Sequence, residues 1–121
     1  MNEMTRNQEI ATIIRSQIKT IVFMQVGASD FFAIESGLQF RTRVKTNQKH
    51  WIEITLNGLD YYDIVLKRLV TSGKRKGEVV AEYKANNVDC STLSETVYRI
   101  GSTNRPAPGF LEEYGIKAVQ G

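Results

Sequence analysis

His50 and Cys90 are the two side chains best suited to catalysis, and each is the only residue of its type in the chain. An imidazole titrates near neutral pH and could act as a general base. His50, however, falls on the apolar side of an alternating segment, which is typical of a buried structural histidine. Cys90 directly precedes a predicted helix, whose positive end would lower the pKa of a thiol. Because no second histidine is present to orient a nucleophile, we interpret His50 as a structural histidine of the core or sheet edge and Cys90 as a buried or incidental cysteine.

Asp60 and Asp63, with two tyrosines between them, form an acidic and aromatic cluster beside a turn dipeptide, Asn57-Gly58. Side chains three residues apart on a strand point to opposite faces, so these carboxylates could share a metal only if the turn bent them together. We expect Asp60 to accept local backbone hydrogen bonds instead. The single histidine and cysteine exclude a His/Cys metal site, and the nine glycines form no phosphate-binding motif. The sequence therefore predicts no metal, no cofactor and no enzymatic activity.

Basic residues are concentrated in the middle of the chain. Residues 41–84 contain ten lysines and arginines and five acidic residues, whereas the whole chain has a formal charge of only +3 and a pI near 9.1. The candidate binding residues of this segment are Arg41, Arg43, Lys45, Trp51, Lys67, Lys74, Arg75 and Lys76. A basic sheet face with an aromatic side chain could follow a phosphate backbone and stack a base. Alternatively, these charges are solvated and structural, with Arg41 paired to Glu53 and Arg43 lying over Trp51.

Length and composition indicate one globular domain. A chain of 121 residues with 41% hydrophobic and 24% charged residues buries enough surface to fold without metals or disulfides. One cysteine excludes an internal disulfide framework and is typical of a reducing cytoplasm. The longest apolar run, residues 21–24, is far too short for a membrane span, and the first residues lack the pattern of a signal peptide. We therefore expect a cytoplasmic protein without membrane contact.

The first element that must position these residues is an N-terminal helix. Thr5 to Gln8 match a capping box, and an apolar stripe at spacings of three and four predicts a helix over roughly residues 6–19. The stripe consists of Ile10, Ile13, Ile14, Ile18 and Ile21. Residues 20–26 could extend this helix or form a short buried strand. Their β-branched and aromatic side chains favour the strand.

From Phe31 onward the apolar period changes to two, which predicts four or five antiparallel strands joined by short turns. One register places Val44 opposite His50 and Leu38 opposite Leu56, so that the alternating apolar residues of both strands lie on one face. The opposite face then carries three residues that need some cover. These are Trp51, Val65 and Leu69.

A second helix is predicted between residues 89 and 101. Thr92 to Glu95 match another capping box, and Gly101 is a plausible stop after the stripe. The stripe is Leu93, Val97 and Ile100. The sequence thus predicts one α+β domain over residues 1–101, with the second helix packed on one face of the sheet. Residues 102–121 are predicted to form a Pro-containing linker and an apolar tail, which covers the Trp51 face or docks on a partner.

Three segments resemble a family of small proteins encoded by phages and integrated elements. They match the patterns GA-x-x-F at residues 27–31, GL-x-F at 37–40 and ITLNG-x-D-x-YD at 54–63. The similarity extends over roughly residues 9–101. The family carries no assigned activity, so the resemblance implies a mobile-element setting and assigns no site residue.

Together these observations predict a non-enzymatic phage or mobile-element accessory protein that binds a macromolecule in the host cytoplasm. A host protein is favoured as the partner. The alternatives are nucleic acid bound on the basic sheet face, an anionic small ligand such as a nucleotide, and a homodimer. Salt dependence separates the first of these alternatives from the favoured one, because contacts to phosphates weaken steeply with ionic strength.

Overall fold

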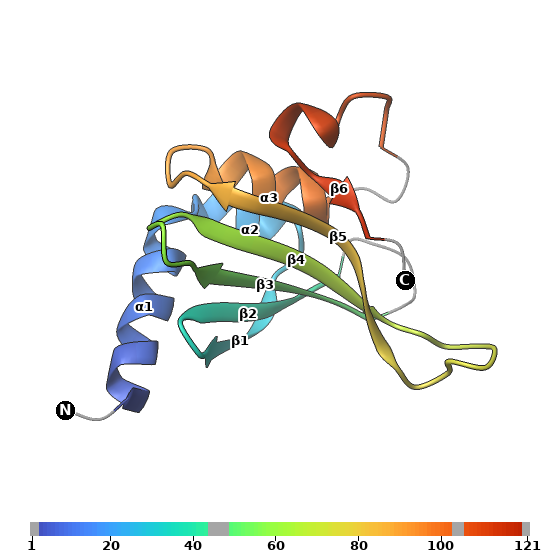
Figure 1. Ribbon diagram of the computed structural model, residues 1–121, viewed down its shortest axis with the longest axis horizontal. Coiled ribbons are helices and arrows are strands. Elements are labelled where there is room, and N and C mark those ends of the chain that lie inside the picture. Colours follow the sequence, from blue (N-terminus) through green and yellow to red (C-terminus); the bar gives the residue numbers. More distant parts are fainter. Residues whose placement is uncertain (1–2, 44–48, 103–105, 120–121) are drawn as a thin grey trace.

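The computed structural model describes residues 3–43, 49–102 and 106–119 (Figure 1). It shows the expected α+β arrangement: a helix, an antiparallel sheet and a further helix. The sheet has six strands in the order β1-β2-β3-β4-β5-β6, one more than expected. None of the helices in the described ranges is long and apolar enough to cross a membrane.

The elements follow one another with short connections. Their bounds are α1 (Glu3–Gln17), α2 (Thr20–Gln25), β1 (Ser29–Ile34), β2 (Gly37–Thr42), β3 (His50–Leu56), β4 (Tyr62–Leu69), β5 (Val79–Val88), α3 (Leu93–Gly101), the 3-10 turn η1 (Glu112–Tyr114) and β6 (Lys117–Ala118).

One face of the sheet packs against the helices and forms the core. Helix α1 contacts β1 and β2, and α3 contacts β4 and β5; in Figure 1, α2 and α3 lie behind the sheet. The strand residues on this face alternate with polar residues, as expected. The fully buried ones at its centre are Phe40, Ile52, Ile54, Ile64 and Leu66.

The register between β2 and β3 differs from the prediction by two residues. Thr42 lies opposite His50, and Leu38 lies opposite Ile54 rather than Leu56. A shift of two residues leaves every side chain on its original face, so the apolar pattern cannot distinguish the two registers. The predicted faces are therefore correct and the predicted partners wrong. Val44 lies outside the described residues.

Residues 20–25 form helix α2, so the predicted strand is wrong. The helical backbone is interrupted at Lys19, which is extended and whose N–H donates to Ser94 Oγ at 2.9 Å. After this break, Val22 and Val26, four residues apart, are both buried. Packing against α3 has overridden the local β propensity. The first capping box is also wrong, because α1 already begins at Glu3.

Helix α3 presents its predicted stripe of Leu93, Val97 and Ile100, all fully buried. Its capping box is not formed, since the Thr92 side chain makes no capping hydrogen bond. Gly101 lies inside the helix rather than beyond it. A Cβ there would come within 2.9 Å of Val26 Cγ1, so this glycine permits the close approach of α3 to α2.

The C-terminal segment packs beside α3 and along β5. Leu111 and Ile116 are buried with the core, and β6 pairs with β5 through Tyr83 and Ala118. Arg99 of α3 binds this segment, because its Nη1 donates to the Phe110 carbonyl and to Glu113 Oε2, each at 3.0 Å. The Arg99 guanidinium also lies over the Tyr114 ring at 4.3 Å. The segment thus lies on the helical side of the sheet and not over Trp51.

Candidate interaction surfaces

His50 is buried at the start of β3, on the core side that its position in the alternation indicated. It is 2% exposed, and its Nε2 lies 3.7 Å from Glu82 Oε2. Arg68 Nε reaches the same carboxylate oxygen at 3.0 Å. Cys90 is a free thiol on the surface. Within the described ranges no group of three or more His, Cys, Asp or Glu residues is arranged to hold a metal ion.

The distinctive ITLNG-x-D-x-YD segment builds the turn between β3 and β4. Asn57 Oδ1 accepts the backbone N–H groups of Leu59 at 2.8 Å and Tyr61 at 3.2 Å. Its Nδ2 donates to Asp63 Oδ1 at 3.1 Å and to Asn87 Oδ1 at 2.8 Å. One amide side chain therefore holds the turn and ties it to the end of β5, so these motif residues have a structural role.

Asp60 does not have the role predicted for it. Its backbone adopts a positive φ of 62°, and it is Asn57 that accepts the local N–H groups. Asp63 accepts the backbone N–H of Asn87 at 3.1 Å. The sequence marked this site as a turn but did not show which polar side chain would organise it, because Asn and Asp favour the same turn conformations.

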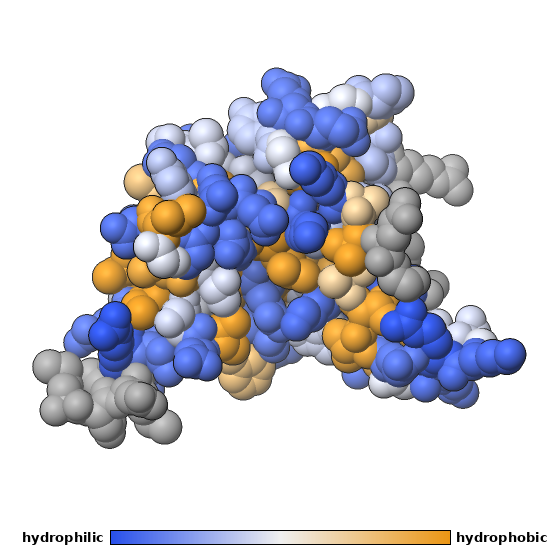
Figure 2. Space-filling model, in the orientation of Figure 1, coloured by the Kyte–Doolittle hydropathy of each residue, from blue (hydrophilic) through white to orange (hydrophobic). Residues whose placement is uncertain are grey.

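The predicted basic residues are only partly brought together. Arg41, Trp51 and Lys67 lie side by side across β2, β3 and β4 on the face away from the helices. Polar and apolar residues are mixed over this view of the molecule (Figure 2). Lys74, Arg75 and Lys76 lie in the exposed β4–β5 loop, which projects beyond the rest of the sheet (Figure 1). Lys45 lies outside the described residues.

Two of these basic residues form ion pairs within the chain. Lys67 Nζ lies 2.8 Å from Glu53 Oε2, and Arg75 Nε lies 2.9 Å from Glu78 Oε2. The predicted Arg41–Glu53 and Arg43–Trp51 pairs are wrong because of the register shift. Arg41 lies opposite Trp51. Arg43 Nε donates instead to Ser29 Oγ at 3.0 Å.

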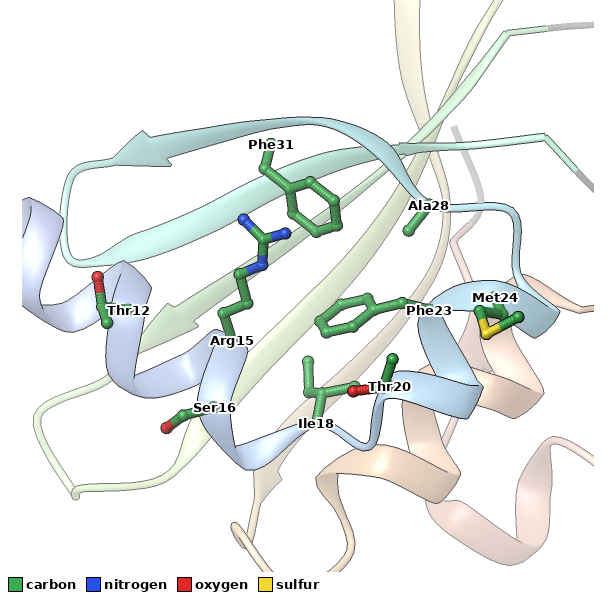
Figure 3. Close-up of a pocket in the computed structure, with 9 residues that line it drawn as sticks. All are labelled: Thr12, Arg15, Ser16, Ile18, Thr20, Phe23, Met24, Ala28 and Phe31. Carbon is green, nitrogen blue, oxygen red and sulfur yellow. The ribbon is translucent and has the colours of Figure 1, made fainter.

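A surface that sequence reasoning missed lies where α1, α2 and β1 meet. A hollow of about 570 Å³ opens between them, with Phe23, Phe31 and the Arg15 side chain facing into it (Figure 3). The Phe23 and Phe31 rings pack edge to face with centroids 5.3 Å apart. A second hollow of about 440 Å³ follows β1 and shares Thr12, Arg15 and Phe31 with the first. We call the two together the α1–β1 groove.

Large apolar side chains are exposed around the α1–β1 groove. Met24 and Phe32 line the two hollows and are 72% and 58% exposed, and Ile13, 51% exposed, adjoins Gln8 and Thr12 of the groove. We call these three residues the apolar rim. Ile21, 54% exposed, lies instead at a separate hollow beside α3. The predicted stripe placed Ile13 and Ile21 on the apolar side of the first helix. Ile21 lies beyond the break at Lys19, in α2, and Ile13 lies on a part of α1 that the sheet does not cover. The pair Phe31-Phe32 was the available signal, since adjacent residues of a strand point to opposite faces.

Among the residues that the structure describes, Arg15 is the only charged one that lines the groove. Its guanidinium carbon lies 4.0 Å from the centroid of the Phe31 ring. No carboxylate in the described part of the chain forms an ion pair with it. Beside it, β1 is an end strand of the sheet, so its outer edge has no strand partner among the described residues.

Comparisons with models of protein families, with curated proteins and with solved structures found no match. What the protein does must therefore be inferred from its surfaces. Two of them stand out. One is the row of Arg41, Trp51 and Lys67 on the open sheet face, and the other is the α1–β1 groove with its apolar rim.

Proposed function

We propose that this protein is a non-enzymatic accessory protein of a phage or another mobile element, and that it binds a host protein through the α1–β1 groove. The observation that carries this proposal is the gathering of the exposed side chains of Met24, Phe32 and Ile13 along an aromatic groove. Apolar side chains grouped around a concave surface are characteristic of sites that bind other proteins. The mobile-element setting rests on the sequence resemblance, and the host cytoplasm as location rests on the single free cysteine.

The rim residues are suited to anchoring a partner. Phe32 offers a large, rigid apolar area, and Met24 is a flexible side chain that adapts to irregular surfaces. Burial of such side chains at the centre of an interface supplies most of the binding free energy in many complexes. The groove is concave and the rim side chains project from its margin. Such a surface favours a protein partner whose own surface is complementary to both.

A second candidate function is nucleic-acid binding on the open sheet face. The observation that favours it is the row of Arg41, Trp51 and Lys67, in which an aromatic side chain lies between two cations. Stacking of a base on Trp51 would be sequence-tolerant and salt-dependent. The ion pair between Lys67 and Glu53 weakens this candidate, because a phosphate would have to compete with the carboxylate.

Site-specific photo-crosslinking in host cells tests the proposal. The crosslinking amino acid benzoylphenylalanine is placed at Met24 in one variant and at Leu59 in a matched control. Leu59 is 68% exposed on the β3–β4 turn and lines neither hollow of the groove. We expect a host-protein adduct of defined mass from position 24 and none from position 59.

Two other results would contradict the proposal. Equal adducts from both positions would indicate non-specific contact. A third variant carries the same amino acid at Trp51. Adducts to nucleic acid from that position, with none from position 24, would support the second candidate instead.

A further inference from the structure

We infer that the α1–β1 groove binds an extended, acidic and apolar segment of the partner protein, which adds to the open edge of β1 and places a carboxylate on Arg15. This inference rests on the proposed function and specifies the chemistry of its partner.

The shape of the groove favours an extended segment. One wall is the free edge of β1, and the other is the side of α1 that carries Gln8, Thr12 and Arg15. A strand edge offers backbone N–H and C=O groups in a row, which an extended segment can pair with. A bound helix would satisfy its own backbone groups and leave this edge unpaired.

The pairing is confined to one part of β1. Asp30 has a φ of 55°, and the register between β1 and β2 shifts between Ser29 and Phe32. Regular pairing with β2 covers only Phe32 to Ile34. An added segment would therefore pair along these residues and then pass over the hollow, because a bulge bends the strand that contains it.

Charge complementarity defines one side chain of the segment. Arg15 stacks on Phe31 with one face of its guanidinium, and its hydrogen-bond donors lie in the plane of that group. Thr12 and Ser16 already donate their hydroxyl protons to the Gln8 and Ile13 carbonyls. A carboxylate from outside can form two parallel hydrogen bonds with the in-plane donors, a geometry that suits arginine better than lysine.

The hollow beside Arg15 defines a second side chain. Its lining includes Phe23, Ala28 and Ile18, and its volume of about 570 Å³ accommodates an aromatic or large aliphatic side chain. Figure 3 shows Phe23 and the Arg15 guanidinium on neighbouring sides of this space. A segment with a carboxylate next to a large apolar residue would therefore occupy both positions at once.

Selection from a displayed library of random peptides against the purified full chain tests this inference. We expect enrichment of peptides with Asp or Glu beside an aromatic or large aliphatic residue. Arg15→Glu should weaken the binding of an enriched peptide about tenfold or more, and a selection against this variant should enrich basic peptides. Lys74→Glu is the control with the same change of charge, and it should leave the affinity unchanged. Circular dichroism shows whether both variants remain folded.

Alternate N-methylation of the enriched peptide tests strand addition. Methylation of the amides that pair with β1 should abolish binding, whereas methylation of the intervening amides should be tolerated. Equal tolerance of both sets, enrichment without acidic residues, or unchanged affinity in Arg15→Glu would overturn the inference. If no peptide is enriched but the crosslink from position 24 persists, host-protein binding stands and the extended segment is wrong. If that crosslink is also absent, both proposals fail.

Discussion

The two edges of the sheet differ in how the rest of the chain packs against them. At one edge, β6 pairs with β5, and Arg99 holds the preceding turn through two acceptors and the Tyr114 ring. At the other edge, the outer side of β1 has no strand beside it in the described structure, and β1 carries the exposed Phe32. Open apolar edges favour unwanted association, so proteins usually cover or charge them. Under the proposed function, the edge at β6 serves stability and the edge at β1 serves binding.

The largest expected effect on stability is at the edge where β6 pairs with β5. Ile116→Ala removes a side chain that is 1% exposed and leaves a cavity, so we expect a loss of about 3 kcal/mol in the free energy of unfolding. Met24→Ala at the open edge is the matched control and should change it by less than about 0.5 kcal/mol. Urea denaturation measures both. Similar losses in the two variants would remove the proposed difference between the edges.

A smaller effect is expected from loosening the closed edge without opening the core. Arg99→Met keeps an apolar stem on α3 but loses the contacts to the Phe110 carbonyl, Glu95 and Glu113. Hydrogen exchange at the amides of β6 should become several-fold faster, while that of β3 stays the same. Arg75→Met, which removes an ion pair at the distant hairpin, is the control. Unchanged exchange in β6 would show that pairing with β5 alone holds this strand.

Asp89, at the entry into α3, should make the stability of the domain sensitive to acid. Hydrogen bonds from the Ser91 hydroxyl and backbone N–H lower the pKa of Asp89 below its ordinary value of 3.8. The contribution of Asp89 to stability is therefore complete above that value and is lost as the pH falls through the lowered pKa. Asp89→Asn should reduce the acid-induced decrease of the urea midpoint between pH 6 and pH 2. An identical pH profile would contradict this assignment.

The smallest effect on stability is expected at the open edge itself. Phe32→Lys replaces a side chain that is 58% exposed, so the free energy of unfolding should change by less than about 0.5 kcal/mol. The crosslink from position 24 should nevertheless fall to background. Analytical sedimentation of the unmodified protein tests whether a second copy of the chain, rather than a host protein, covers this edge. A concentration-dependent dimer that Phe32→Lys abolishes would show that a second copy covers this edge.

The sequence was sufficient for the faces of the sheet and insufficient for its pairings. Alternation assigned Phe40, Ile52 and Ile64 to the core because a residue's face depends only on its parity. The partner of Arg41 depended on where the β2–β3 connection begins, and no parity rule determines that. The pairing of Glu53 with Lys67 rather than Arg41 follows from the same shift.

The α1–β1 groove could not be predicted because it depends on long-range contacts. The break at Lys19 is fixed by Ser94, which lies far along the chain. This break turns α2 away from the line of α1 and leaves Ile21 exposed while Val22 is buried. A local sequence pattern contains no information on such a contact. The apolar stripe that the sequence assigns to one helix is therefore divided between α1 and α2.

The order of the strands has a consequence for how the chain folds. Each strand from β1 to β5 pairs with its neighbour in the sequence, so these pairings close short loops and cost little entropy. The pairing of Tyr83 with Ala118 closes a much longer loop, which contains α3. On the ribosome, the five-strand meander can thus assemble while both of its margins are still unprotected. Only when the segment with Lys117 and Ala118 has been synthesised can the middle of β5, at Tyr83 and Lys84, gain its partner.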